Sequence, residues 1–295
     1  QLGLLPLGRD PRTGLWEFVH VQSGSVPERD AGGQLVLAED SGIVLVLLPG
    51  GTFWMGAQRD DPDGTSYDPL AASDEQPVHQ VTLWPFFLSR HELTQSQWAG
   101  FTGHNPSTYT LDFPGEERDD GGLHPVENVS WDECALVLGR MGLTLPTEAQ
   151  WEYGARAGTQ TPWWTGADRE SLAGAVNFGD AAALRFGAIW PALSDWLDDG
   201  FAVHAHAGGL RPNAFGLEQV HGNVGEWCRE RWSGYSAPHS LGDGERLPTD
   251  FLNRIVRGGG FVFPVEASRV TARPAWESTY RSNFIGVRAA RPLER

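Results

Sequence analysis

Short apolar runs separated by turn residues dominate the first third of the chain and predict β-strands. Residues 43–48 form the longest run, and residues 50–56 continue it as a turn and a second strand. Residues 78–88 predict the next strand region. Residues 1–41 alternate shorter apolar runs with turn residues, which predicts leader strands ahead of a single domain that spans residues 42–295.

Three helices are predicted by one local signal. Thr94, Ser130 and Thr147 are each followed three residues later by Gln or Glu, which is the pattern of a capping box. The second helix places Cys134 on its apolar face and is expected to end at Gly142. Cys134 is therefore predicted to be a core side chain.

The segment from 254 to 288 has fixed ends and an irregular middle. Ile255 and Val256 predict a strand that leads into three glycines, and residues 285–288 predict a closing strand. Between them, aromatic residues and arginines alternate with neither a helical nor a two-residue period. We therefore expect much of this middle part to be displayed on the surface.

Composition narrows the classes of function. Of the 295 residues, 40% are hydrophobic, which predicts a globular fold, and the formal charge of −16 argues against a nucleic-acid partner. No run reaches the roughly 18 apolar residues of a membrane span. Two cysteines exclude a disulfide framework, and the absence of Lys with few Met and Cys fits a thermophile. The start at Gln1 suggests a fragment of a longer polypeptide, which leaves the compartment open.

Two further motifs complete a family pattern with the segment 254–288. They are Leu145-Pro146-Thr147-Glu148-Ala149-Gln150-Trp151-Glu152 and Gly222-Asn223-Val224-Gly225-Glu226-Trp227. Together the three resemble the formylglycine-generating enzyme family, or sulfatase-modifying factor fold, a variant of the C-type lectin fold. The resemblance implies an α+β protein with antiparallel sheets, a few helices and much irregular structure.

The same resemblance bears on catalysis. In the enzymes of the family, two cysteines after the glycine turn carry copper and oxidise a substrate cysteine. Phe263 and Ser268 occupy those positions here, and neither supplies the thiolate that binds copper and performs the redox step. We therefore predict no copper and no enzyme activity of this kind.

The resemblance also implies calcium. Asn177 and Asp199 would provide side-chain oxygens of the family's first site, and Phe178 and Phe201 would provide carbonyls. Such oxygen ligands suit Ca²⁺, and residues 158–212 have so little periodicity that an organising ion is favoured. The alternative is that Asn177 and Asp199 only cap turns.

A second family calcium site would use the carbonyls of Gly222 and Val224 and the carboxylate of Glu226. Gln219 occupies the position that the family usually gives to Asn or Asp, which puts this site in doubt. The alternative is that Glu226 forms an ion pair with an arginine.

Three functional hypotheses remain open. The first is a non-catalytic protein that binds a ligand, most readily a protein, through a variable C-terminal surface, as in the variable proteins of diversity-generating retroelements. The second is an oxidoreductase of the family with a different set of residues. The third is a sensor or accessory domain attached to an upstream Ser/Thr kinase domain, because similar leaders occur in such fusions.

Under the first hypothesis, the predicted ligand-binding residues are Phe261, Phe263, Val265, Glu266, Arg269, Thr271, Arg273, Trp276, Ser278, Tyr280, Arg281, Ser282, Asn283 and Phe284.

Overall fold

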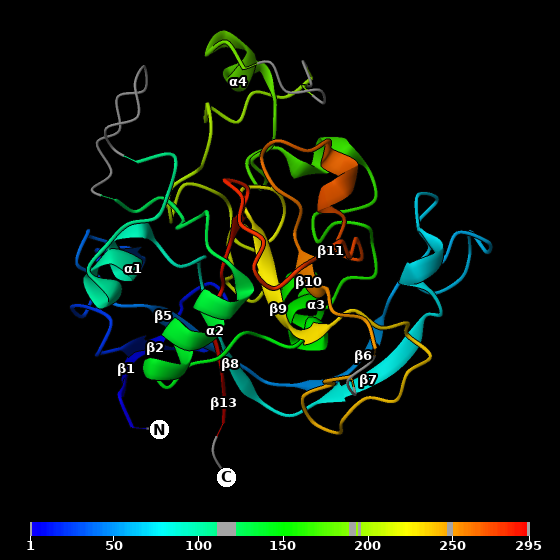
Figure 1. The fold of residues 1–295 in the computed structure, drawn as a ribbon, viewed down its shortest axis with the longest axis horizontal. Helices are drawn as coiled ribbons and strands as arrows, with labels where there is room; N and C mark the ends of the chain where they lie inside the picture. Colours follow the sequence, from blue (N-terminus) through cyan, green and yellow to red (C-terminus); the bar gives the residue numbers. More distant parts are fainter. Residues whose placement is uncertain (1, 111–121, 189–192, 194–195, 247–249, 294–295) are drawn as a thin grey trace.

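A five-stranded antiparallel sheet forms one part of the computed structural model, which describes residues 2–110, 122–188, 193, 196–246 and 250–293 (Figure 1). The first two strands come from the predicted leader. Phe18 of the second strand lies opposite Leu45, so the leader strands extend the sheet of the main body. In spatial order the strands are β1 (Leu4–Arg9), β2 (Trp16–His20), β5 (Val44–Leu48), β8 (Phe86–Ser89) and β13 (Ala290–Pro292).

A second sheet carries the C-terminal segment. In spatial order its strands are β11 (Ala275–Trp276), β10 (Arg254–Arg257), β9 (Gly225–Arg231) and β12 (Ile285–Gly286). The strands predicted at Ile255 and at Ile285 are thus present. The pair of β12 and β9 is parallel, whereas the other pairs in both sheets are antiparallel. Since β10 and β12 lie on opposite sides of β9, the chain between them must cross the end of this sheet.

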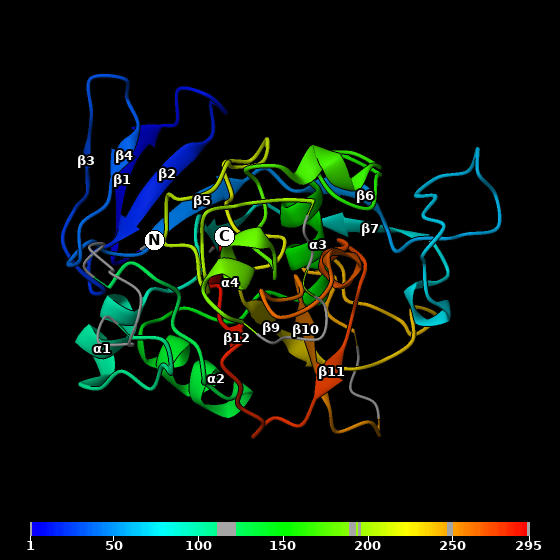
Figure 2. The same cartoon turned by 90° about the horizontal axis from the view of Figure 1, so that it is seen from above.

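Two short hairpins extend from opposite sides of the molecule. Figure 2 shows the hairpin of β3 and β4 beside β1 and β2, while that of β6 and β7 points the other way and carries a long loop. The hairpin strands are β3 (Glu28–Arg29), β4 (Leu35–Val36), β6 (Gly51–Met55) and β7 (His79–Leu83).

All three predicted capping boxes are present. In each, the hydroxyl of Thr94, Ser130 or Thr147 accepts a hydrogen bond from the backbone N–H three residues later. The side-chain oxygen of that later residue accepts the backbone N–H of the capping residue. No helix among the described residues is long and apolar enough to cross a bilayer. The helices are α1 (Gln95–Thr102), α2 (Trp131–Arg140), α3 (Glu148–Arg156) and α4 (Ala181–Arg185), with 3₁₀ turns η1 (Ser73–Glu75), η2 (Arg169–Leu172) and η3 (Val265–Ser268).

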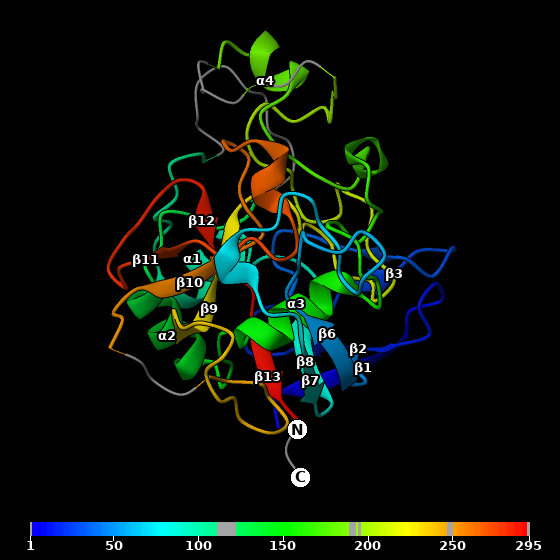
Figure 3. The same ribbon diagram turned by 90° about the vertical axis from the view of Figure 1, so that its right-hand side faces the viewer.

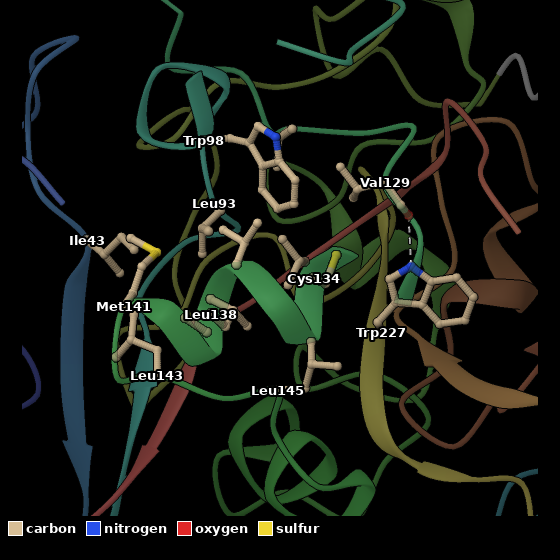
Figure 4. Close-up of a cluster of buried hydrophobic side chains, with 14 of the residues drawn as sticks. Ile43, Leu93, Trp98, Val129, Cys134, Leu138, Met141, Leu143, Leu145 and Trp227 are labelled. Atoms are coloured by element: carbon tan, nitrogen blue, oxygen red, sulfur yellow. Dashed lines mark hydrogen bonds between the residues drawn. The ribbon is translucent and has the colours of Figure 1, made fainter. Parts of the chain in front are cut away.

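Helix α2 packs into a hydrophobic cluster that joins the two sheets. Cys134 and Leu138 are fully buried, as predicted for Cys134, and lie in one cluster with Ile43, which directly precedes β5, and Trp227 of β9 (Figure 4). The indole N–H of Trp227 donates to the carbonyl of Val129 at 3.0 Å. This bond holds the entry to α2 against β9.

Helix α3 is buried on every side, including its charged residues. Trp151 contributes to a second apolar cluster, but Glu148, Glu152 and Arg156 are also inside. A buried charge is costly unless it is paired and hydrogen-bonded. The fold must therefore bring cations to this helix from elsewhere.

The irregular region that ends near Pro212 is fastened to the motif at residues 222–227. Asn177 donates to the side-chain oxygen of Asn223 at 2.9 Å, and Asn223 donates its backbone N–H to the carbonyl of Asn177. Gly222 has a φ of +71°, and a Cβ there would overlap the Asn177 carbonyl oxygen. Figure 3 shows α4 at the far end of this region, away from both sheets.

Candidate functional site

The segment between β10 and β12 divides into an inward half and an outward half. Residues 258–273 are mostly buried, whereas residues 276–284 are half-buried or exposed. The two halves meet at β11, where Ala275 lies opposite Ile255. We call residues 276–284 together with Phe263 the loop surface.

Part of the predicted ligand-binding set is wrong because its side chains are buried. Phe261 is only 1% exposed, and Arg273 is only 4% exposed. Large or charged side chains sealed in the interior have no surface to offer a ligand. The residues corrected in this way are Phe261, Val265, Arg269, Thr271 and Arg273.

The two buried arginines of this set are structural. Arg273 donates from Nε and Nη2 to the two carboxylate oxygens of Glu148, at 2.7 and 2.8 Å. Burial alone would raise the pKa of Glu148, but the charges of Arg273, Arg257 and Arg246 lower it to about 2. Arg273 thus supplies a cation that the buried helix α3 requires.

Arg269 also neutralises buried carboxylates, in the loop between β6 and β7. Its guanidinium donates to Asp68 at 2.6 Å and to Glu75 at 2.7 and 2.9 Å. The hydroxyl of Thr271 donates to the same Glu75 carboxylate. The loop between β6 and β7 is therefore tied to the inward half by buried ion pairs.

The loop surface is fastened to the start of α2. Ser278 donates its hydroxyl to the Asp132 carboxylate at 3.1 Å, and Arg281 pairs with Glu133 at 2.8 Å. The backbone N–H of Asn128 donates to the carbonyl of Ser282 at 2.9 Å. These contacts give the irregular loop a defined position.

Aromatic rings lie along the loop surface in two pairs. Phe263 and Phe284 meet edge to face with ring centroids 4.7 Å apart, and Trp276 and Tyr280 are 5.4 Å apart. Tyr280 is 39% exposed, and the other three rings are half-buried. The remaining predicted residues, Glu266, Ser278, Arg281, Ser282 and Asn283, are also exposed or half-buried.

A second aromatic cluster contacts the loop surface from the interior of the protein. Phe261 lies 4.6 Å from His204 and 5.6 Å from Tyr109, measured between ring centroids. A ring nitrogen of His204 lies 3.0 Å from the carbonyl of Asn283. No local pattern predicts this grouping, because Tyr109, His204 and Phe261 are 57 to 152 residues apart in the chain.

The two positions assigned to the family's cysteines have different environments. Phe263 is half-buried on the loop surface, whereas Ser268 is buried and its hydroxyl donates to the carbonyl of Val265 at 2.7 Å. The cysteines of the chain, Cys134 and Cys228, lie elsewhere in the core. Burial raises the pKa of both thiols, so neither has the character of a reactive thiolate.

Three of the residues predicted for the first calcium site are linked by hydrogen bonds, and their polar groups would suit a cation. Asn177 Oδ1 is buried without a hydrogen-bond partner in the described part of the chain. Burial, followed by the nearby charge of Asp180, raises the pKa of Asp199 to about 8. The N–H groups of Phe178 and Phe201 donate to the Asp199 carboxylate at 3.2 and 2.8 Å, which fixes its orientation. An amide oxygen without a partner and a partly buried carboxylate with a raised pKa are groups that a bound cation would stabilise.

The carboxylate predicted for the second calcium site has other partners in the structure. Both carboxylate oxygens of Glu226 accept hydrogen bonds from Arg288, at 2.7 to 2.9 Å. Trp151 also donates its indole N–H to Glu226 at 2.7 Å. The backbone N–H groups of Gly222 and Val224 are bonded to Gly258 and Glu92. Glu226 and Arg288 thus form the ion pair of the alternative interpretation, and the second calcium site stays a prediction.

Comparisons with characterised sequences give relatives of several kinds. The chain is 29% identical over 266 residues to the formylglycine-generating enzyme of Thermomonospora curvata, which covers 74% of this chain and 82% of that enzyme. It is 27% identical over 237 residues to the serine/threonine-protein kinase pkn1 of Chlamydia caviae, which covers 73% of this chain and 32% of that kinase. Some relatives are therefore formylglycine-generating enzymes, and others are protein kinases that contain a similar segment.

Solved structures support the predicted fold. PvdO from Pseudomonas aeruginosa is 26% identical with a TM-score of 0.66, over 91% of this chain and 100% of that chain. Variable protein 1 of Treponema denticola is 20% identical with a TM-score of 0.61, over 85% and 96% of the two chains, which is a likeness of fold. The model of the sulfatase-modifying factor enzyme 1-like domain matches residues 37–293, and the chain therefore belongs to this family.

Proposed function

We propose that the protein is a non-catalytic member of its family that binds a ligand, most readily another protein, through the loop surface. The observation that carries the proposal is the pair of residues at the family's cysteine positions. Phe263 has no redox chemistry, and the hydroxyl of Ser268 is buried and hydrogen-bonded. Without paired thiols, copper binding and thiol oxidation have no residues to perform them.

The nature of the loop surface supports a binding role. Its aromatic rings supply apolar area, and its Ser, Asn and Arg side chains supply adaptable hydrogen bonds, as in the binding loops of other recognition proteins. The contacts of the loop with Asp132 and Glu133 hold it in place before a ligand arrives. A preorganised surface loses less conformational entropy on binding.

Binding through this surface is tested by selecting peptides from a displayed library on the purified protein. Selected peptides should lose affinity for Tyr280→Ser. They should keep their affinity for the matched control Trp54→Ser, because Trp54 is equally exposed, at 38%, but lies on β6. Equal binding to both variants, or selection of peptides that distinguish only Trp54→Ser, would contradict the proposal.

The absence of the family's chemistry is tested separately. The purified protein is incubated with copper, oxygen and a peptide that contains a substrate cysteine, and the product is followed by mass spectrometry. We expect no conversion. Conversion of the peptide would favour the alternative of an oxidoreductase with a different set of residues.

Variation of the surface is tested at the DNA level. A retroelement protein would have, near its gene, a near-copy of the segment that encodes residues 254–288, together with a reverse transcriptase gene. Differences between the two copies should fall almost only at adenines. In the structure, the substitutions should map to the loop surface and avoid the buried Arg269 and Arg273, whose replacement would disturb the fold.

A sensor or accessory role in a kinase chain is a second candidate. It is favoured by the likeness to the Chlamydia caviae kinase, of which the matched segment is only 32%. An upstream kinase domain would make the loop surface a sensor and would be compatible with ligand binding. Sequencing the gene upstream of Gln1 tests it, and an unrelated reading frame there would exclude it.

We also propose that one calcium ion organises the irregular region through Asn177 and Asp199, with backbone carbonyls of Phe178 and Phe201. Such an ion would add a positive charge beside Asp180 and Asp199 and give Asn177 Oδ1 a partner. Among the described residues no group of three or more His, Cys, Asp and Glu side chains is placed to hold a metal. Amide and backbone oxygens would therefore complete the site, as Ca²⁺ accepts.

Removal of the ion should lower the melting temperature, because a ligand that binds only the folded state stabilises it by mass action. The wild-type protein is melted in excess chelator and in excess calcium. Asn177→Ala should abolish most of the calcium-dependent difference, whereas Asp198→Asn, at the neighbouring exposed carboxylate, should retain it. An equal melting temperature with and without calcium would exclude this site.

A further inference from the structure

A pocket outside the loop surface gathers four arginines. It has a volume of about 450 Å³ and opens where the ends of β9 and β10 meet the loop before residue 247. This size is within the usual range for small-molecule sites. The lining residues are Arg229, Glu230, Arg231, Ser240, Glu245, Arg246 and Arg254.

Two of these arginines face each other on neighbouring strands. Arg231 of β9 and Arg254 of β10 are directly paired in the antiparallel register, so their side chains project from the same face of the sheet. Like charges at directly opposed positions destabilise a sheet. Burial, and then the charge of Arg231, lowers the pKa of Arg254. The pair is a local concentration of positive charge in a chain with a formal charge of −16.

The other two arginines of the pocket already have carboxylate partners. Arg229 pairs with Asp243 at 2.7 Å and with Glu245 at 2.8 Å. Arg246 donates to Glu148 at 3.3 Å. The carboxylates neutralise the charges of Arg229 and Arg246. These two arginines line the pocket but are not the ones expected to bind a ligand.

Arg231 and Arg254 have no carboxylate partner within the part of the chain that the structure describes. Arg254 is nevertheless held in position: its Nη1 donates to the carbonyl of Arg229 at 3.0 Å, and its guanidinium stacks 3.6 Å from the ring of Trp131. The Nε of Arg254 is buried, so the N–H groups that it could offer to an oxyanion are those of the two Nη atoms.

The carboxyl groups near Arg254 are Asp132, Glu230 and Glu245. Asp132 accepts a hydrogen bond from Ser278, and Glu245 pairs with Arg229. Glu230 is buried, and burial, followed by the charge of Glu148, raises its pKa to about 8. One oxygen of Glu230 accepts the N–H of Glu148 at 2.7 Å, and the other has no hydrogen-bond partner in the described residues. At neutral pH Glu230 is therefore mostly protonated, and the pocket keeps an excess of positive charge.

We propose that this pocket binds the oxyanion group, carboxylate or phosphate, of a small-molecule ligand between Arg231 and Arg254. The anion would relieve the repulsion between the two opposed arginines and would be desolvated by the pocket walls. This site is separate from the loop surface and does not depend on the function proposed for it.

The proposal is tested with two probes, inorganic phosphate and succinate, by isothermal titration calorimetry at constant ionic strength. We expect saturable binding of at least one probe, and the comparison of the two identifies the preferred oxyanion. The double variant Arg231→Gln/Arg254→Gln should weaken that binding by about tenfold or more, since each charge-assisted hydrogen bond contributes strongly to affinity. The control Arg12→Gln removes an exposed arginine elsewhere and should bind as the wild type does.

Thermal melts separate loss of the site from loss of the fold. Without an anion, Arg231→Gln should melt at the same temperature as the wild type or higher, because a like-charge repulsion is removed. With the anion, the wild type should gain stability and Arg231→Gln should gain much less. Saturable binding of neither probe, or unchanged binding by a folded double variant, would overturn the proposal.

Discussion

Buried arginines connect parts of this protein that are distant in sequence. Arg257 donates to Glu152 and to the carbonyl of Val270, and Arg288 donates to Glu226 and to the carbonyl of Glu218. Each guanidinium therefore joins three separate segments. Removing one partner would leave the other charge buried and unpaired, which is far more costly than the loss of a surface pair.

Arg273→Ala should strongly destabilise the fold. It leaves the fully buried Glu148 carboxylate with longer contacts, to Arg246 at 3.3 Å, to the Tyr235 hydroxyl at 3.4 Å and to Arg257 at 3.6 Å. We expect a loss of about 3–5 kcal/mol in the free energy of unfolding, measured by urea denaturation.

Arg281→Ala provides the matched control. Arg281 belongs to the same C-terminal segment, but its side chain is 47% exposed where it pairs with Glu133. Its loss should cost no more than about 1 kcal/mol. Similar losses in Arg273→Ala and Arg281→Ala would show that Arg273 does not carry the structural role assigned to it.

Asp199 gives the protein a specific pH dependence. Its pKa in the folded state is about 8 because of burial and then of Asp180, against 3.8 for the ordinary group. Between these values the folded state holds a proton that the unfolded state has lost, so stability in chelator should fall as the pH rises from about 4 to about 8.

The variant Asp199→Asn should have a flatter pH profile of unfolding free energy in chelator. Some slope should remain, because burial and then the charge of Glu148 raise the pKa of Glu230 to about 8, so Glu230 also holds a proton in the folded state. Calcium should reduce the slope in the wild type, because a bound cation favours the ionised carboxylate. A profile in chelator that Asp199→Asn does not change would contradict this assignment.

At the scale of elements, α2 links the core to the loop surface. Its apolar face packs between the two sheets, while Asp132 and Glu133 in its first turn bind Ser278 and Arg281. Glu133 also closes the capping box with Ser130. The same turn therefore begins the helix and positions the predicted binding residues.

Ser130→Ala should destabilise the protein and loosen the loop surface. Loss of a capping side chain costs about 1 kcal/mol, and fraying of the first turn would release Asp132 and Glu133 from the loop. Ser130→Asp keeps a capping acceptor and should retain most of the stability. The free energy of unfolding and the hydrogen-exchange rates of residues 276–284 measure the two effects. Unchanged hydrogen exchange of residues 276–284 in Ser130→Ala would show that the helix cap does not hold the loop surface in place.

At the scale of the whole molecule, the leader strands are continuous with the first sheet. Beyond the pairing of β2 with β5, Arg90 at the end of β8 binds Asp10 and Glu17 of the leader and Glu218 of the body. Glu17 and Asp10 are both buried. The leader is thus joined to the body by a strand pair and by buried ion pairs.

Deletion of residues 1–24 should lower the melting temperature and promote aggregation. It leaves β5 as an edge strand with unpaired backbone groups, and it removes two carboxylates from Arg90. The control Glu28→Gln changes an exposed leader residue on β3 and should have little effect. Thermal melts and light scattering distinguish the outcomes, and wild-type behaviour of the deletion variant would show that the body does not need these strands.

Local signals predicted much of the secondary structure and only part of the candidate site. The capping boxes at Thr94, Ser130 and Thr147 were predicted because a cap depends on residues three positions apart. The first calcium residues were predicted from the family resemblance, and three of them are linked by hydrogen bonds in the structure. The burial of Arg269 and Arg273 was missed, because their carboxylate partners lie about 125 to 200 residues away.

The sequence by itself determined the strands, the capped helices and the family. These features depend on residue identity and on neighbours a few positions apart. The tertiary structure alone decided which C-terminal residues face outward, that Glu226 is bound by Arg288, and that Arg231 opposes Arg254. The physical reason is that burial and charge pairing depend on which distant segments pack together, and no short stretch of sequence specifies that.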